Sequence, residues 1–375
     1  FSGNTASKAG GGVYSMGGTL RIKACTFSNN AAGTSGGGIY ATSAELSDSA
    51  FFANSATDGG GLLVEKTTLT NCTFSTNQAS NDGGALLVAG SNSAEMMNCS
   101  FTANTAKYGG AIYTYSGTLT ITGSILWNDT AQISGNEILS GKVRPTVNYS
   151  NYKGGCTVAS GCTTSETGNI DADPLFVDPA NNDLHLKEGS PAIDSANGCM
   201  SPLTDKEGLS RVDVASVTNT ARVSPVDMGA FEYHAGASDT PAVSPSLASC
   251  CTKDTDAVAP HDYWYCPDRR TRYSADLFCK ANGMNLVNIG DAAENDLVCK
   301  LAGSGSVMID ARCSVYGAKE WEQSTGEALS YTNWAAGEPN NVLSTESCAK
   351  ISDVTVGTWV DDTCVASAFV CEDAH

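Results

Sequence analysis

The amino-acid sequence predicts a mainly β protein in which a parallel β-helix is followed by a small α+β domain. Three observations support this fold class. The first third of the chain repeats one pattern every 23 to 27 residues, the repeat is rich in glycine and asparagine, and the last third has a different order of helices, strands and cysteines. A chain of 375 residues is long enough for two domains with separate cores.

The repeat is defined by a Phe and by an Asn three residues later. This pattern occurs at Phe1 to Asn4, Phe27 to Asn30, Phe51 to Asn54, Phe74 to Asn77 and Phe101 to Asn104, with a weaker copy at Ile125 to Asn128. A glycine-rich turn follows each Asn and leads into an apolar pair such as Ile39-Tyr40. Each unit holds about three short strands separated by Gly or Asn corners, which matches one β-helix coil. Helical repeats are excluded because glycine costs about 1 kcal/mol at each helical position.

The Phe of each coil, and the apolar residue after each glycine turn, are expected to point inward. Each should stack on its counterpart one coil away, about 4.8 Å along the axis. Asn is expected at the corners because it tolerates left-handed geometry and forms side-chain ladders. Cys72 and Cys99 hold the same repeat position in neighbouring coils, where they either form a disulfide or fill the interior as reduced thiols.

The pairing of Phe-x-x-Asn with Gly-Gly-Ala-Ile resembles the repeat of the polymorphic outer-membrane protein family. This resemblance implies a right-handed parallel β-helix used in adhesion. Four stretches resemble the closing section of secreted bacterial β-helix proteins: Ser124 to Asn128, Asn169 to Val177, Gly189 to Asp194 and Asp227 to Tyr233. Together the two resemblances imply a β-helix over residues 1–233, with repeats of about 24 residues.

A stretch rich in Pro, Ala and Ser, residues 234–262, is predicted to be a linker, and a second domain is predicted over residues 263–375. Within that domain we expect a helix at Tyr273 to Ala281, a strand at Asn285 to Ile289 and a helix at Asp291 to Ala302. Asp291 and Glu294 have the spacing of a capping box for the second helix.

The carboxyl-terminal part, residues 250–375, resembles C-type lectin-like domains in an ordered set of motifs. These are Tyr331-Thr332-Asn333-Trp334, Gly337-Glu338-Pro339-Asn340-Asn341, Glu346-Ser347-Cys348 and Trp359-Val360-Asp361. The resemblance implies two disulfides, Cys279–Cys371 and Cys348–Cys364. It also implies one calcium site, held by Glu338, Asn340, Glu346 and Asp361, whose side chains also hydrogen-bond the sugar.

The ligand set suits calcium, which binds six to eight oxygen donors. In the family, the Glu-Pro-Asn order of Glu338 to Asn340 implies mannose, glucose or fucose type sugars. Val360 stands where the family has Asn, which removes one calcium oxygen and weakens the expected site. Asp362 could substitute only if its strand shifted by one residue.

The other cysteines and the compartment follow from composition. Cys156 with Cys162 and Cys299 with Cys313 are predicted pairs, and Cys266 is expected to pair with Cys250 or Cys251. Fifteen cysteines indicate an oxidising, extracellular or cell-surface location, and the odd number leaves one thiol free or paired between chains. Sequons predict glycosylation at Asn71, Asn98, Asn128 and Asn148. Because the chain starts without Met and inside a repeat, we expect a trimmed product of a longer precursor.

Charge and residue placement exclude several function classes. The net charge of −19 disfavours nucleic acid and anionic membrane surfaces as partners, and no apolar run is long enough to span a bilayer. No enzyme is expected, because the acidic residues of the coils occupy differing repeat positions and no His precedes His185. Acidic residues between Asp171 and Asp194 suggest either a calcium cluster or turn and capping roles, of which the second is favoured.

Three hypotheses remain from the sequence. The first is an adhesive β-helix stalk that presents a calcium-dependent lectin-like domain to glycans or glycoproteins. The second is a structural subunit that self-associates into an extracellular fibre or matrix and uses the lectin-like domain for protein docking. The third, a polysaccharide lyase, is disfavoured by the arguments against catalysis.

Overall fold

The computed structural model describes the chain apart from residues 91, 155–167, 215, 216, 218–224, 236–239, 242–246, 255–260, 271, 304, 314–320, 341–347, 363–366, 374 and 375. Within the described residues, the protein is mainly β and divides into two compact units, Phe1–Ser244 and Pro245–His375. None of the described helices is long and apolar enough to cross a membrane.

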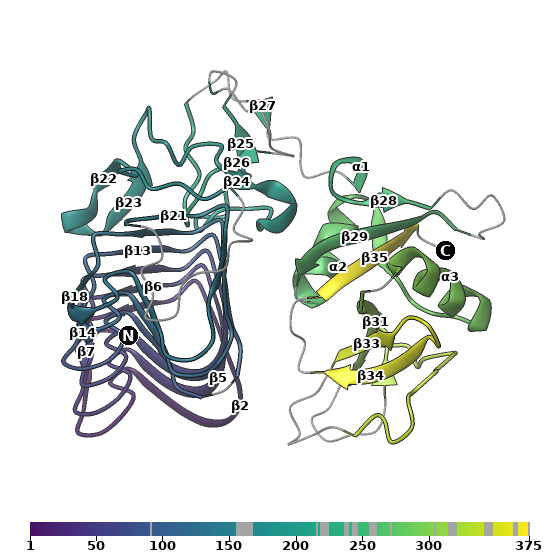
Figure 1. The fold of residues 1–375 in the computed structure, drawn as a ribbon, viewed down its shortest axis with the longest axis horizontal. Coiled ribbons are helices and arrows are strands. Elements are labelled where there is room, and N and C mark those ends of the chain that lie inside the picture. Colours follow the sequence, from purple (N-terminus) through teal and green to yellow (C-terminus); the bar gives the residue numbers. More distant parts are fainter. Residues whose placement is uncertain are drawn as a thin grey trace. The chain divides into compact units, whose positions relative to one another are not determined.

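The amino-terminal unit is a parallel β-helix of about six coils, drawn in purple to teal in Figure 1. The first sheet contains β1 (Thr5–Ala6), β4 (Ala31–Ala32), β7 (Ser55–Ala56), β10 (Gln78–Ala79), β14 (Thr105–Tyr108) and β18 (Thr130–Ser134). The second contains β2 (Val13–Lys23), β5 (Ile39–Ser47), β8 (Leu62–Thr70), β11 (Leu86–Val88), β12 (Ala94–Met97), β15 (Ile112–Thr114), β16 (Leu119–Thr122), β19 (Ile138–Ser140) and β20 (Thr146–Asn148). The third contains β3 (Thr26–Ser28), β6 (Ala50–Phe52), β9 (Thr73–Ser75), β13 (Ser100–Thr102), β17 (Ile125–Trp127) and β21 (Asn151–Tyr152). The prediction of about three strands per coil is therefore confirmed.

The interior of the β-helix contains columns of equivalent residues. The rings of Phe1, Phe27, Phe51, Phe74 and Phe101 stack with centroid separations of 4.7 to 4.8 Å. All of these rings except that of Phe1 are fully buried. The predicted inward orientation of the Phe residues and their spacing are both confirmed.

A ladder of asparagines runs beside the Phe column. Asn54 is representative, because its Nδ2 donates to the carbonyl of Phe27 and to Oδ1 of Asn77, both at 2.9 Å. Its own Oδ1 accepts from the backbone N and from Nδ2 of Asn30, both at 3.0 Å. These buried side chains satisfy backbone groups at the corner, which would otherwise be costly to bury.

The ladder differs from the expectation in one respect. The left-handed backbone belongs to the residue before each ladder asparagine, such as Ala53 with φ of 54° before Asn54. The last rung is Asp129, whose Oδ1 accepts from the backbone N and Nδ2 of Asn104 at 2.7 and 2.8 Å.

The repeated glycine turns are required because neighbouring coils approach closely there. A Cβ added to Gly37 would lie 2.2 Å from the carbonyl oxygen of Gly60 in the next coil, which no real side chain tolerates. A Cβ on Gly38 would lie 3.2 Å from the ring of Phe51. The glycines therefore allow both the tight turn and the packing of the Phe column.

The stacked strands of the coils end at β21, and one further parallel bridge joins Asn151 to Ile170. From Phe176 on, the described residues form antiparallel pairs rather than further coils, so the region predicted as β-helix up to residue 233 includes a stretch of different structure within the same compact unit. These pairs are β22 (Phe176–Asp178) with β23 (Asp183–Leu186), β24 (Ala196–Asn197) with β26 (Pro225–Val226), and β25 (Val212–Asp213) with β27 (Thr240–Pro241). Two short 3-10 helices, Pro179–Asn181 and Gly198–Met200, lie between them. We call residues 174–233 the lateral segment; it lacks the Phe-x-x-Asn repeat that builds a coil.

A buried arginine joins the lateral segment to the side of the coils. Arg211 Nη1 donates to Oε2 of Glu232 at 2.8 Å, and the two side chains are 3% and 0% exposed. Arg211 Nη2 also donates to Oδ1 of Asn71 in the β-helix at 3.0 Å. The lateral segment therefore covers the coils through a polar contact that is shielded from water.

The carboxyl-terminal unit is a small α+β domain. Its elements are α1 (Leu247–Cys250), β28 (Thr252–Lys253), β29 (Tyr263–Arg270), α2 (Arg272–Ala281), β30 (Met284–Leu286), α3 (Ala292–Ala302), β31 (Val307–Cys313), β32 (Trp321–Glu322), β33 (Cys348–Asp353), β34 (Thr358–Asp362) and β35 (Ser367–Asp373). One eight-stranded sheet has the main order β28-β29-β35-β31-β33-β34. The predicted helices and the predicted strand correspond to α2, α3 and β30. Asp291 Oδ1 accepts from the backbone N of Glu294 at 2.9 Å, as expected of the residue that caps α3.

The predicted linker, residues 234–262, is partly structured. It contains β27, α1 and β28, of which β28 pairs with β29. The boundary between the compact units falls within it, after Ser244.

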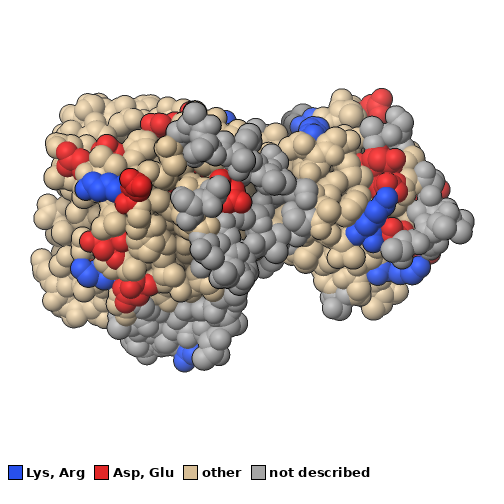
Figure 2. All heavy atoms as spheres, turned by 90° about the horizontal axis from the view of Figure 1, so that it is seen from above, with Lys and Arg blue, Asp and Glu red and all other residues tan. Residues whose placement is uncertain are grey.

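Charged side chains are mixed on the face of the molecule shown in Figure 2. Most of the blue basic side chains there lie beside red acidic ones. Ion pairs between Arg21 and Glu45 and between Lys23 and Asp48 join neighbouring coils of the β-helix.

Candidate functional site

The candidate site lies where the loop containing Gly337 to Asn340 meets β34. The Glu338-Pro339 peptide bond is cis. Nδ2 of Asn340 lies 2.8 Å from each carboxylate oxygen of Glu338. The backbone N of Asn340 donates to Oε2 of Glu338 at 3.1 Å and to Oδ1 of Asp361 at 3.0 Å. Three of the four predicted ligands therefore meet around one amide.

Backbone hydrogen bonds hold this loop against β34. Ala335 N donates to the carbonyl of Trp359 at 2.8 Å, and Glu338 N donates to the carbonyl of Ala335 at 3.0 Å. The buried Trp359 is fixed in turn, because its Nε1 donates to Oδ1 of Asn295 on α3 at 2.8 Å. Our sequence reasoning missed Asn295, whose only signal is an amide within the predicted helix from Asp291 to Ala302.

The side chains of β34 alternate between two environments. Trp359 and Asp361 are buried, whereas Val360 and Asp362 are partly exposed. Asp362 forms an ion pair with Lys350 on β33. The strand register places Asp361 beside Ala349 without the shift that would move Asp362 into the site. Asp362 therefore does not replace the amide that is missing at Val360.

The two carboxyl groups of the site interact directly. Asp361 is 5% exposed. Its side chain hydrogen-bonds that of Glu338 and raises the pKa of the Glu338 carboxyl above its usual value. A pKa raised by a neighbouring carboxylate means that repulsion between the two charges is relieved either by a proton or by a cation.

Calcium suits this donor set, because it prefers carboxylate and amide oxygens. Glu338, Asn340 and Asp361 supply such oxygens, and the crowded pair of carboxyls is the kind of site that a divalent cation neutralises. Glu346, the fourth predicted ligand, lies outside the described residues. Among the residues that the structure does describe, no three His, Cys, Asp or Glu side chains gather closely enough to hold a metal ion.

The disulfides agree in part with the sequence predictions. Cys279–Cys371 is confirmed, and Cys266 is paired with Cys251, one of the two expected partners. Cys348 is disulfide-bonded, and its predicted partner Cys364 lies outside the described residues, as do both members of the predicted Cys156–Cys162 pair.

The predicted Cys299–Cys313 disulfide is wrong, because Cys299 is a free thiol. The sulfur of Cys299 lies beside Gly357, in the turn between β33 and β34, where it is 3.3 Å from the point that a Cβ on this glycine would occupy. That turn is near Val307, the first residue of β31, whereas Cys313 is the last. Six residues of strand span about 20 Å, which is too far for a disulfide, whose Cα atoms lie within about 7 Å.

Cys72 and Cys99 follow the second interpretation and are buried free thiols in neighbouring coils. They fill the interior and hydrogen-bond each other. Burial raises the pKa of Cys99 well above its usual value.

Two of the four predicted glycosylation sites are wrong for the folded protein. Nδ2 of Asn71 donates to the carbonyl of Thr204 at 2.9 Å, and Nδ2 of Asn98 donates to the carbonyl of Asp227 at 3.0 Å. Both side chains are covered by the lateral segment and leave no space for a glycan. The two remaining sequons lie on more accessible side chains, Asn128 and Asn148.

The acidic residues between Asp171 and Asp194 have turn and capping roles. Oδ1 of Asp173 accepts from the backbone N of Leu175, and Oδ1 of Asp183 accepts from the backbone N of His185. Oδ2 of Asp194 accepts from the backbone N of Val214. The favoured interpretation of this stretch is therefore supported.

Comparisons with known proteins match both units. The family model for "Right handed beta helix region" matches residues 1–126, and that for "Lectin C-type domain" matches residues 268–373. Lithostathine-1 of Mus musculus is 31% identical over 134 residues, which cover 34% of this chain and 81% of that protein. Lithostathine-1-alpha of Homo sapiens is 29% identical over 134 residues, with the same shares covered. The solved carbohydrate-recognition domain of the mouse scavenger receptor C-type lectin is 28% identical, covers 33% of this chain and 94% of that chain, and has a TM-score of 0.29.

The chain therefore belongs to the C-type lectin family through its carboxyl-terminal unit. In the same chain, a right-handed β-helix region precedes that unit. Both resemblances expected from the sequence motifs are confirmed at this level.

Proposed function

We propose that this protein is a non-enzymatic extracellular adhesin whose lectin-like domain binds sugar through calcium. Glu338, Asn340 and Asp361 would hold the ion together with Glu346. The observation that supports this proposal is the Asn340 backbone amide, which bridges the carboxylates of Glu338 and Asp361 at 3.1 and 3.0 Å.

The chain's own groups explain how a sugar would be held. When bound, calcium supplies a positive charge and open coordination positions for two vicinal hydroxyls. The Glu338 carboxylate accepts hydrogen bonds from those hydroxyls, and Nδ2 of Asn340 donates one. The Glu-Pro-Asn order favours mannose, glucose or fucose type sugars. The backbone bonds from Ala335 and Glu338 hold the loop in place before binding, which lowers the entropic cost of binding.

A glycan array tests this proposal directly. The intact chain is applied to mannose, glucose, fucose and galactose type glycans in calcium and again in EDTA. We expect calcium-dependent binding to the first three classes and its loss in Glu338→Gln. The exposed Glu327→Gln in the same domain is the matched control and retains binding. Equal binding of mannose-type glycans in EDTA contradicts the proposal.

The β-helix serves in this proposal as a stiff support. Its Phe and Asn columns tie each coil to the next, and from Phe27 and Asn30 onward these side chains are buried. A panel of acidic polysaccharides tests the absence of catalysis, and the appearance of an unsaturated product would overturn it.

A second candidate function is that of a fibre or matrix subunit. The observation that favours it is the stacking of equivalent residues from coil to coil, as in the column from Phe27 to Phe101. Repeats of this kind assemble through contacts between neighbouring repeats. Sedimentation of the chain at increasing concentration tests this candidate, and a strictly monomeric species contradicts it.

A further inference from the structure

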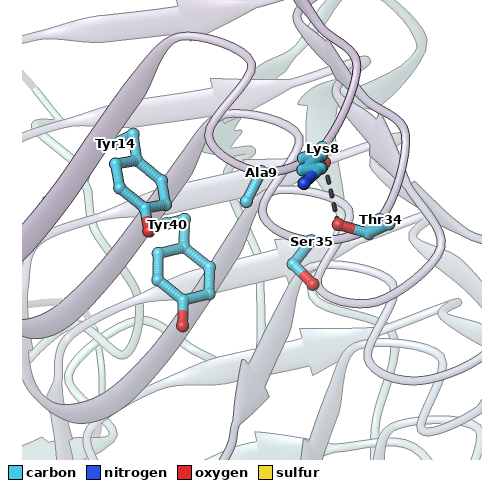
Figure 3. A pocket seen from close by; sticks show the side chains of 6 residues that line it. All are labelled: Lys8, Ala9, Tyr14, Thr34, Ser35 and Tyr40. Carbon is cyan, nitrogen blue, oxygen red and sulfur yellow. Dashed lines mark hydrogen bonds between the residues drawn. The ribbon is translucent and has the colours of Figure 1, made fainter.

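The β-helix carries an open cleft that the lectin-type activity does not use. It has a volume of about 480 Å³ and is lined by Lys8, Ala9, Tyr14, Thr34, Ser35 and Tyr40. Figure 3 shows the rings of Tyr14 and Tyr40 next to each other along one side, with Lys8, Thr34 and Ser35 on the other. Volumes of about 300–1,000 Å³, with aromatic walls and a few polar groups, are typical of small-molecule sites.

The register of the first two coils builds the aromatic side of the cleft. Tyr14 on β2 is paired with Tyr40 on β5, and the rings stack at 5.1 Å with an interplanar angle of 14°. Tyr14 is 56% exposed. Tyrosine offers a rigid amphipathic surface with little side-chain entropy to lose, which suits recognition of a ring that is apolar on one face and polar at its edge.

The side of the cleft opposite the tyrosines is formed by the turns that contain Lys8 and Thr34, which stack on each other in the first two coils. Ala9 and Ser35 form a parallel bridge, and Thr34 Oγ1 donates to the carbonyl of Lys8 at 2.9 Å. This bond leaves the lone pairs of Thr34 Oγ1 available as acceptors, and the Ser35 hydroxyl also lines the cleft. The Lys8 side chain is exposed at its rim.

The cleft is confined to the first two coils. Leu63 and Leu87 occupy the position of the two tyrosines in the next coils, in register with them. They are 6% and 1% exposed, so the groove is filled there. Tyr113 holds the same position one coil beyond Leu87, but its ring packs edge-on against that of Tyr115. The two stacked tyrosines that line the cleft are therefore those of the first two coils.

We infer that this cleft is a second glycan site, which binds a sugar ring carrying a carboxylate. The tyrosine rings contact the ring face of the sugar, Thr34 and Ser35 hydrogen-bond its hydroxyls, and Lys8 pairs with the carboxylate. The charge of the ligand follows from Lys8, because it is the charged side chain among the residues that line the cleft. This site needs no metal ion.

The test measures binding of a hyaluronan hexasaccharide to the intact chain by calorimetry in EDTA and physiological salt, which keeps any calcium-dependent lectin site inactive. The same hexasaccharide with its carboxylates reduced to alcohols is the matched ligand control. We expect binding of the acidic form and at least tenfold weaker binding of the reduced form.

Two variants test whether the acidic hexasaccharide binds in the cleft. Lys8→Met and Tyr14→Leu are each expected to weaken binding at least tenfold. Leucine is tolerated at this position, as Leu63 and Leu87 show, and circular dichroism confirms folding. Lys23→Met, which removes a charge from the same coil outside the cleft, is expected to bind like the wild type. No binding of the acidic form, equal binding of the reduced form, or unchanged binding by Lys8→Met and Tyr14→Leu would each overturn the inference.

Discussion

The two units are stabilised in different ways. In the β-helix, equivalent buried residues of neighbouring coils stack in columns, as in the column from Phe27 to Phe101. In the lectin-like domain, the described core residues form one cluster without such columns, and Cys279–Cys371 ties α2 to β35 across a sequence separation of 92 residues. The β-helix depends on nearest-neighbour stacking, whereas the lectin-like domain depends on one irregular core and its crosslinks.

This difference also decides where a binding site can form. A column of identical residues leaves few positions for chemistry, and the cleft lies outside the Phe column, at a position held by Tyr14 and Tyr40 in the first two coils and by leucine in the next two. The lectin-like domain brings Glu338, Asn340 and Asp361 together from a loop and a strand because its fold is irregular.

Replacement of one Phe rung is expected to produce the largest effect. Phe74→Ala removes a fully buried ring that stacks on both neighbours, and should lower the free energy of unfolding of the β-helix by about 3–5 kcal/mol. Chemical denaturation measures this value. Phe1→Ala is the control, because that ring is 57% exposed and stacks on Phe27 alone. Equal losses for the two variants would contradict the stacking account.

Removal of the long-range crosslink should affect only the lectin-like domain. The double variant Cys279→Ala with Cys371→Ala is expected to destabilise that domain by about 2–5 kcal/mol, because the unfolded chain gains freedom. The β-helix transition, followed in the same denaturation experiment, should not move. A shift of both transitions by the same amount would show that the two units do not unfold separately.

Restoring the amide that is missing at position 360 tests how far Val360 weakens the calcium site of the lectin-like domain. Val360→Asn places an oxygen next to Asp361 and should tighten calcium binding about tenfold, since a hydrogen bond or ligand of this kind contributes about 1–3 kcal/mol. Calcium titration followed by thermal unfolding measures the change. Val356→Asn, at an exposed position of the neighbouring turn, should leave calcium affinity unchanged. No gain from Val360→Asn would show that Val360 does not weaken the site.

Asp129, the last rung of the asparagine ladder, and Glu137 predict that the folded protein loses stability as the pH rises. In ordinary acid denaturation, stability is lost as the pH falls. Burial raises the pKa of both Asp129 and Glu137, and the pair holds a proton in the folded state. The folded protein then binds more protons than the unfolded chain, so this contribution is full below about pH 4 and is lost as the pH rises.

Glu137→Gln tests this effect, because the amide can still donate to Asp129 and does not ionise. The variant should gain about 1 kcal/mol over the wild type at pH 8, with the difference shrinking toward pH 4. Thermal unfolding across this range measures it, with the exposed Glu65→Gln as the control. A difference that grows on acidification would contradict the shared proton.

Repetition explains how much of the structure could be predicted from the sequence. Five copies of Phe-x-x-Asn reveal both the direction and the spacing of the Phe column. The end of the coils at β21 could not be read this way, because the motifs near Asp194 and Asp227 belong to the lateral segment. The burial of Asn71 and Asn98 was missed for the same reason, since the contacts that cover them come from more than 120 residues away in sequence.

At the candidate site, local motifs were informative and distant partners were not. Glu338, Asn340 and Asp361 stand within motifs that can be recognised along the chain. Asn295, which supports Trp359 from α3, has no motif of its own. The wrong pairing of Cys299 with Cys313 has a similar origin, because proximity in sequence says little about the two ends of a strand.

The most direct test of the central claim is the affinity of the intact chain for a mannose oligosaccharide, measured by calorimetry in calcium and in EDTA. We predict binding in calcium, none in EDTA, and at least tenfold weaker binding in Asp361→Asn, which removes the charge that Asn340 and Glu338 contact. Mannose binding that is unaffected by both EDTA and Asp361→Asn would contradict a calcium-dependent sugar site at Glu338, Asn340 and Asp361.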